Sequence, residues 1–104
     1  MTSFNERAKS FEGKYAHEAD LHFRAVARRN RMLGLWAAEL LGKTGNEANE
    51  YSREVVKADF RENGEEDVLR KVAEDLGGLS DETTVRAKMH ELFSRARAQI
   101  MEEL

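Results

Sequence analysis

Residues Met32–Leu41 read MLGLWAAELL and contain Glu39 as their only charged residue. A helix that is apolar on nearly every side is typical of a position that neighbouring helices bury from several directions. The run is about half as long as the roughly 20 residues that cross a membrane, so it predicts the centre of a helical bundle. We expect it to form the second half of a long helix from about Asp20 to Leu41.

Three further helices are expected where glycines and capping residues separate apolar stripes of helical period. They run from about Asn46 to Asn63 with Gly64 as the stop, from about Glu65 to Leu76 with Gly77-Gly78 as the stop, and onward from Ser80 as the N-cap. Their apolar stripes are Ala48, Tyr51, Val55, Ala58 and Phe60 in the second helix, Val68, Leu69, Val72, Ala73 and Leu76 in the third, and Val85, Met89, Leu92, Phe93, Ala96 and Ile100 in the fourth. Short connections make successive helices antiparallel neighbours. The predicted fold class is all-α, a four-helix bundle over residues 20–104.

The composition fits one small helical domain and excludes several kinds of chemistry. The chain has 104 residues, no proline, no cysteine and 36% charged residues, a length typical of a single domain. Without cysteine there are no disulfides, thiolate metal sites or thiol nucleophiles. The net charge of −3 is uneven, since residues 1–31 carry +3 and residues 32–104 carry −6. The first 20 residues are polar, so we expect no secretory peptide and a cytoplasmic protein.

The N-terminal segment, residues 1–19, has a helical stripe of its own that the bundle does not obviously need. The stripe consists of Phe4, Ala8, Phe11, Tyr15 and Ala19. Gly13 interrupts it, at a cost of about 1 kcal/mol of helix stability relative to alanine. We expect a flexible or marginally helical segment. The pattern leaves two interpretations open: the segment orders against a partner, or its aromatic residues fold back on the bundle and extend the first helix.

Parts of catalytic and metal-binding motifs occur in the sequence, but each motif is incomplete. Gly42-Lys43-Thr44 resembles part of a phosphate loop, but Ala37 stands where that motif requires glycine and no strand precedes it. The three histidines, His17, His22 and His90, do not have the spacing of metal ligands. No nucleophile, base and orienting group form a constellation, so we predict neither an enzyme nor a metal site.

Basic residues in the first predicted helix suggest two alternative functions. Arg24, Arg28 and Arg31 share one helix face and form a plausible phosphate-binding strip. A nucleic-acid module is disfavoured because no recognition helix is evident and the rest of the chain is acidic. A second alternative is an adenine-nucleotide sensor in which Arg24, Arg28 and Lys43 contact ATP or ADP weakly. A protein–protein scaffold remains the fallback.

Several blocks of sequence carry a resemblance to a known family. They are EGKYAHEADLHFR at Glu12–Arg24, ARRNRMLGLWAA at Ala27–Ala38, VKADF at Val56–Phe60 and EDVLRKV at Glu66–Val72. In these blocks, and in Phe4-x-x-Arg7, the chain resembles the zeta subunit of alphaproteobacterial F-type ATP synthases. The resemblance covers essentially the whole chain, and the block at residues 27–38 is the most specific.

The resemblance implies an inhibitor of ATP hydrolysis. In that family the N-terminal segment enters a catalytic interface between alpha and beta subunits, close to the gamma shaft, and blocks rotation in the hydrolysis direction. The bundle serves as the anchor. By this resemblance the protein is a monomer when free and sits peripheral to the inner membrane when bound to the enzyme. We expect no direct membrane insertion, no nucleic-acid binding and no cofactor other than the weak ATP or ADP contact considered above.

The resemblance also implies which residues contact the partner. Carried onto this sequence they are Thr2, Phe4, Asn5, Arg7, Ala8, Phe11, Lys14 and Tyr15. The three aromatic residues are expected as apolar anchors and the two cations as charge partners. Asn5 stands where the family usually has an acid, and Phe11 where a polar residue is more familiar.

Overall fold

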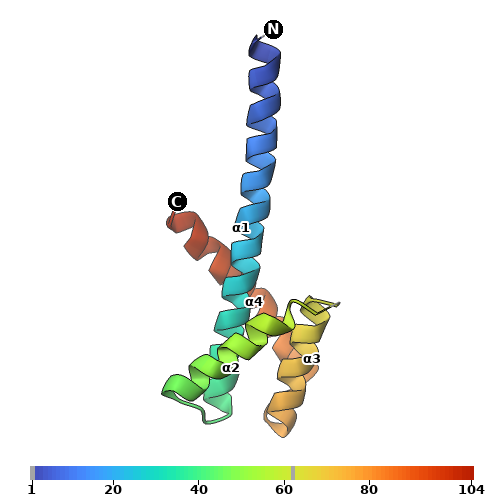
Figure 1. The fold of residues 1–104 in the computed structure, drawn as a ribbon. Coiled ribbons are helices and arrows are strands. Elements are labelled where there is room, and N and C mark those ends of the chain that lie inside the picture. Colours follow the sequence, from blue (N-terminus) through green and yellow to red (C-terminus); the bar gives the residue numbers. More distant parts are fainter. Residues whose placement is uncertain (1, 62) are drawn as a thin grey trace.

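A computed structural model describes the backbone of residues 2–61 and 63–104 and the side chains of residues 18–61 and 63–104. The chain forms α1 (Thr2–Leu40), α2 (Gly45–Ala58), α3 (Glu65–Leu76), the short 3-10 helix η1 (Gly77–Leu79) and α4 (Glu82–Glu102). No strand occurs among these residues. The prediction of an all-α protein built from four helices is therefore confirmed (Figure 1).

The four helices share one hydrophobic core. α1 packs against both α2 and α4, and α3 contacts all three of the other helices. The buried core residues are Leu33, Ala37, Ala38, Tyr51, Val55, Ala58, Val68, Leu69, Val72, Leu76, Val85, Met89 and Leu92. Every α-helix contributes to this set, because each has an apolar stripe that only its neighbours can cover. Over the described residues, no helix combines the length and apolar content that crossing a membrane requires.

α1 differs from its prediction at its start and in the burial of its apolar half. The helix begins at Thr2 and passes the expected start near Asp20 without interruption. Within the apolar half, Leu33, Ala37 and Ala38 are fully buried, but Leu35 is 36% exposed and Leu40 42% exposed. Three neighbouring helices bury this half of α1 from several directions, as expected, but they leave the face that carries Leu35 and Leu40 open.

α2 ends at Ala58, five residues before the predicted end, and Phe60 is not a core residue. Phe60 is 75% exposed. The apolar stripe stops at Ala58 because the next positions in helical register, residues 61 and 62, are charged. The amides of Phe60 and Arg61 bond the carbonyls three residues earlier, which turns the chain out of the helix. Gly64 is the N-cap of α3 and not the end of α2.

The bounds of α3 agree with the prediction, and the start of α4 differs by one residue. Gly77 ends α3 with a φ of 52°, a conformation that glycine adopts without the steric cost of a side chain. Asp81 is the N-cap of α4, since its Oδ1 accepts a 2.7 Å hydrogen bond from the amide of Thr84. The predicted cap, Ser80, makes no such bond, and its buried Oγ has no hydrogen-bond partner among the described residues.

Candidate partner-binding site

The eight residues that the resemblance assigns to partner contact all lie in the first 15 residues of α1. Their backbone is helical, but their side chains lie outside the described ones, so their roles stay predictions. The proposed division into residues 1–19 and 20–104 likewise stays a prediction. α1 crosses that boundary as one continuous helix.

The three residues suggested for nucleotide contact do not meet. Arg24 Nε lies 3.1 Å from Asp20 Oδ2 on the same helix. Arg28 donates two hydrogen bonds, of 2.6 and 2.9 Å, to the carboxylate of Glu103 at the end of α4. Lys43 lies in the loop after α1, whose last residue, Leu40, is about 18 Å along the helix from Arg28 at about 1.5 Å per residue. The structure therefore pairs the two arginines with acids and leaves Lys43 at the far end of the helix.

The pair between Arg28 and Glu103 fixes the end of α4 to the middle of α1. The hydrogen bond from Arg28 holds the pKa of Glu103 below its ordinary value, and the carboxylate raises the pKa of Arg28 in return. Both groups are exposed to solvent, which weakens such a pair. The pair therefore adds little to the stability of the fold, but it engages the Arg28 guanidinium that a nucleotide would need.

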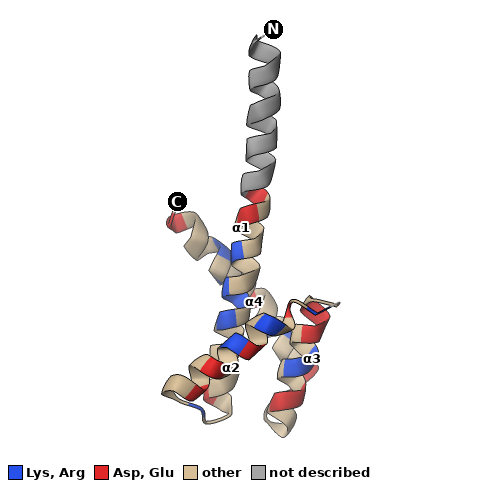
Figure 2. Ribbon diagram, in the orientation of Figure 1, with Lys and Arg blue, Asp and Glu red and all other residues tan. Residues whose placement is uncertain are grey.

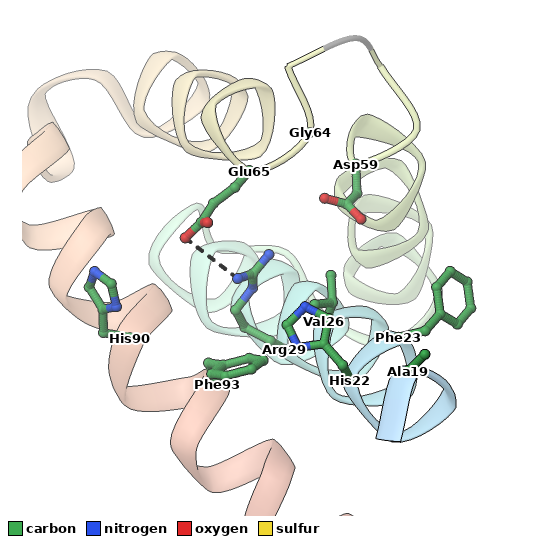
Figure 3. A pocket seen from close by; sticks show the side chains of 10 residues that line it. All are labelled: Ala19, His22, Phe23, Val26, Arg29, Asp59, Gly64, Glu65, His90 and Phe93. Carbon is green, nitrogen blue, oxygen red and sulfur yellow. Dashed lines mark ion pairs between the residues drawn. The ribbon is translucent and has the colours of Figure 1, made fainter. Parts of the chain in front are cut away.

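A groove of about 690 Å³ opens between α1, α4 and the connection from α2 to α3. We call it the Arg29 groove; its lining includes His22, Phe23, Arg29, Glu65, His90 and Phe93 (Figure 3). The rings of His22 and Phe93 meet edge to face, with centroids 5.7 Å apart. His22 of α1 and His90 of α4 line this same groove although they come from different helices. No cluster of three or more metal-ligating side chains occurs among the described residues.

Arg29 itself is held by the protein. The residue is only 4% exposed, its Cζ lies 5.9 Å from the centroid of the Phe93 ring, and its Nη1 lies 3.6 Å from Glu65 Oε1. Its Nε donates a 3.0 Å hydrogen bond to Asn30 Oδ1. Burial lowers the pKa of Arg29, whereas the charges of Glu65 and Asp59 act in the opposite direction. The guanidinium still remains charged at any physiological pH.

Contacts within the protein position the Arg29 guanidinium, although its buried Nη2 has no hydrogen-bond partner among the described residues. Figure 3 shows its guanidinium between Asp59, just after α2, and Glu65, at the start of α3. The side chain therefore ties the middle of α1 to the start of α3 through Glu65, and the negative charge of Asp59 acts on it from a longer distance. Sequence analysis missed this role, because Arg29 stands in a run of arginines in which nothing marks the buried one.

A second groove, of about 470 Å³, lies between α1 and α2. We call it the basic groove; its lining residues are Arg31, Asn49, Ser52, Arg53, Val56 and Lys57. Sequence analysis recognised Arg31 as a basic residue on α1 but not its neighbours on α2. The available signal was the spacing of Asn49, Arg53 and Lys57, four residues apart on one face of a helix.

The described part of the chain thus defines a small helical bundle with open surface grooves. Comparison with known protein families shows to which family the chain belongs. The family model described as ATPase inhibitor subunit zeta matches residues 1–99. The chain belongs to this family, and the inhibitor role expected from the resemblance is supported.

A solved structure shares this fold. A chain determined by NMR in solution is 58% identical, with a TM-score of 0.73, over 81% of this chain and 99% of the other. At this identity the likeness extends to sequence as well as fold. No curated protein matches the chain.

Proposed function

We propose that this protein inhibits ATP hydrolysis by an F-type ATP synthase by inserting its N-terminal segment at a catalytic interface near the rotor. Membership of the inhibitor family supports an inhibitory role. The observation that carries the mechanism is the continuity of α1, which runs from Thr2 to Leu40. One helix therefore contains both the candidate inhibitory residues and part of the core.

This continuity gives the bundle a mechanical purpose. Leu33, Ala37 and Ala38 fix the second half of α1 in the core. The base of the N-terminal segment then leaves the bundle in a fixed direction. A segment whose base is already oriented loses less conformational freedom on binding than a free peptide does. The bundle, residues 20–104, is thus an anchor that delivers the segment to the catalytic head.

The candidate contact residues are of two kinds, apolar anchors and charged groups. Phe4, Phe11 and Tyr15 would fill apolar pockets at the interface of the alpha, beta and gamma subunits. Arg7 and Lys14 would pair with acids there. Aromatic anchors commonly carry most of the binding energy of such an interface. Association with the ATP synthase would place the protein peripheral to the inner membrane.

Deleting Met1–Lys14 tests the mechanism. We expect the shortened protein to lose inhibition of ATP hydrolysis by its purified ATP synthase and to keep the helical circular dichroism spectrum of the bundle. The triple variant F4A/F11A/Y15A should lose inhibition as well. F60A is the matched control, because it removes an exposed aromatic ring from the bundle and should inhibit normally. Full inhibition by the shortened protein would disprove the mechanism.

The adenine-nucleotide alternative lacks comparable support. Arg24 and Arg28 already pair with Asp20 and Glu103, and Lys43 is too far along α1 to join them. An NMR titration with ATP is the direct measurement. Localised shifts at these three residues would revive the alternative, and unchanged spectra would end it.

A further inference from the structure

The basic groove is a concave surface with a net positive charge that the proposed mechanism does not use. Figure 2 shows Lys and Arg residues of α1 and α2 gathered where the two helices cross. Arg31 comes from α1, and Arg53 and Lys57 come from α2. No aspartate or glutamate lines the groove. The concentration of positive charge is notable because the chain as a whole is acidic, with a net charge of −3.

The three cations of the basic groove are free of ion pairs within the described residues. The ion pairs found among the described residues involve other cations, among them Arg24, Arg28 and Arg29. Arg31, Arg53 and Lys57 are all exposed. Mutual repulsion of three like charges is unfavourable unless an anion lies among them. The Arg29 groove differs because its lining already includes two carboxylates, those of Glu65 and Asp59, together with the arginine.

The floor of the groove is fixed, so the charged side chains start from defined positions. Ser52 is buried, and its Oγ donates a 3.0 Å hydrogen bond to the carbonyl of Arg31. This bond holds α2 against α1 at the centre of the groove. Asn49, Arg53 and Lys57 follow one another at four-residue intervals along α2. At about 1.5 Å per residue they form a polar row about 12 Å long.

We infer that the basic groove binds an acidic segment of the ATP synthase, with carboxylates spaced along a helix or an extended strip. The inference rests on the proposed function, because it assigns a second contact to the same partner. Arginine guanidinium groups match the planar geometry of carboxylates and can bind them through two hydrogen bonds. Acids four residues apart on a partner helix would repeat about every 6 Å, the same interval as the row on α2.

The shape of the groove favours distributed carboxylates over one compact phosphate. Arg53 and Lys57 lie about 6 Å apart along α2, and Asn49 adds a polar group one turn further, so the row offers a line of contacts longer than a single phosphate. A line of carboxylates neutralises Arg31, Arg53 and Lys57 together. Such a contact acts mainly on the rate of association, because opposite charges steer the two surfaces toward each other before they touch. The basic groove would therefore dock the bundle, while the N-terminal segment inhibits.

The test is the double variant R53E/K57E in the full chain, with R61E/R70E as a matched control of equal charge change. Arg61 and Arg70 are exposed and line a different groove, one that also contains acids. Binding to the purified ATP synthase is measured by surface plasmon resonance at low and physiological salt. We expect R53E/K57E to raise the Kd at least tenfold, mainly through slower association, and to flatten its salt dependence. The control variant should bind as the unmodified chain does.

Inhibition separates this inference from the proposed function. At saturating concentration R53E/K57E should still inhibit ATP hydrolysis, because its N-terminal segment is intact. The protein lacking residues 1–14 should not inhibit but should retain a weak, salt-dependent affinity that R53E/K57E removes. If the shortened protein still inhibits, the proposed mechanism fails, whatever the groove does.

Three results would overturn the inference. The first is equal affinity of R53E/K57E and the unmodified chain for the ATP synthase. The second is an equal loss of affinity in both double variants, which would show an effect of net charge alone. The third is unchanged affinity for the ATP synthase together with loss of binding to ATP, inorganic phosphate or a short DNA duplex, which would assign the groove to a different anion. Circular dichroism of both variants checks that the bundle is folded.

Discussion

Gly34 of α1 lies directly against the backbone of Ser52 in α2. A Cβ atom on Gly34 would stand 2.6 Å from Ser52 Cα and 3.3 Å from Val55 Cβ. Glycine weakens a helix by about 0.5–1 kcal/mol relative to alanine, so its place in the middle of α1 needs a compensating gain. The gain is the close crossing of the two helices, which buries Val55 and brings Ser52 Oγ to the carbonyl of Arg31.

Substituting Gly34 by alanine should destabilise the fold. The methyl group would meet backbone, which cannot move aside as a flexible side chain can. We expect a net loss of about 1–3 kcal/mol, typical of overpacking in a core, and a Tm lower by about 4–8 °C for each kcal/mol. Thermal unfolding followed by circular dichroism measures the change.

Gly78→Ala is the control for that substitution. A Cβ on Gly78 would meet nothing within 4 Å, and its φ is not in the left-handed region. Its Tm should match or slightly exceed that of the unmodified chain, because alanine restricts the unfolded state more than glycine does. An equal fall in Tm for both variants would contradict the importance of the helix crossing.

Arg29→Ala should be the most damaging substitution among the arginines of α1. It removes the buried stem beside Phe93 and leaves Glu65 and Asp59 without their shared cation. Because both carboxylates remain partly solvated, we expect a loss of about 1–3 kcal/mol, below the full effect of breaking a wholly buried pair. Denaturant unfolding of each variant gives the free energy.

Two companion variants separate the causes of that loss. Arg24→Ala breaks an exposed pair with Asp20 and should change the free energy of unfolding by less than about 0.5 kcal/mol. Arg29→Met keeps the apolar stem but not the charge, so its stability should fall between those of Arg29→Ala and the unmodified chain. If Arg29→Ala proves as mild as Arg24→Ala, the guanidinium does not tie α1 to α3.

The start of α4 provides a comparison of two adjacent residues. Asp81→Ala should lower the Tm by several degrees, because it removes the acceptor for the amide of Thr84. Ser80→Ala should have little effect or raise the Tm slightly, since the buried hydroxyl of Ser80 has no partner among the described residues. A larger loss from Ser80→Ala would mean that the cap is Ser80, as the sequence pattern predicted.

The cap should also respond to pH in a defined direction. The hydrogen bond from the Thr84 amide lowers the pKa of Asp81 below its ordinary value. The stabilising effect of this hydrogen bond is therefore fully present above the pKa that the Asp81 carboxyl has in the unfolded chain, about 4. It is lost as the pH falls through the lower pKa of the folded state. The difference in Tm between the unmodified chain and Asp81→Ala should shrink below pH 4, and a constant difference from pH 7 to pH 2 would contradict this.

The features that depend on local periodicity could be predicted without the structure. The bounds of α3 followed from an apolar stripe at Val68, Val72 and Leu76 and a glycine stop. The buried face of α4 was also predicted, apart from Phe93, which is half-buried over Arg29. These predictions succeed because a helix of 3.6 residues per turn places its apolar residues on one side regardless of what covers them.

Which helix faces meet depends on tertiary contacts and could not be predicted. The tertiary structure placed Gly34 at a helix crossing, buried Arg29 while its neighbour Arg28 stayed near the surface, and set Arg31 opposite Arg53. Leu35 remained exposed although Leu33 and Gly34 just before it are buried. The rotation and crossing of packed helices arise from contacts between residues far apart in the chain. Periodicity along one helix shows which side is apolar, but the burial of each residue and the grooves between helices depend on where the partner helix lies.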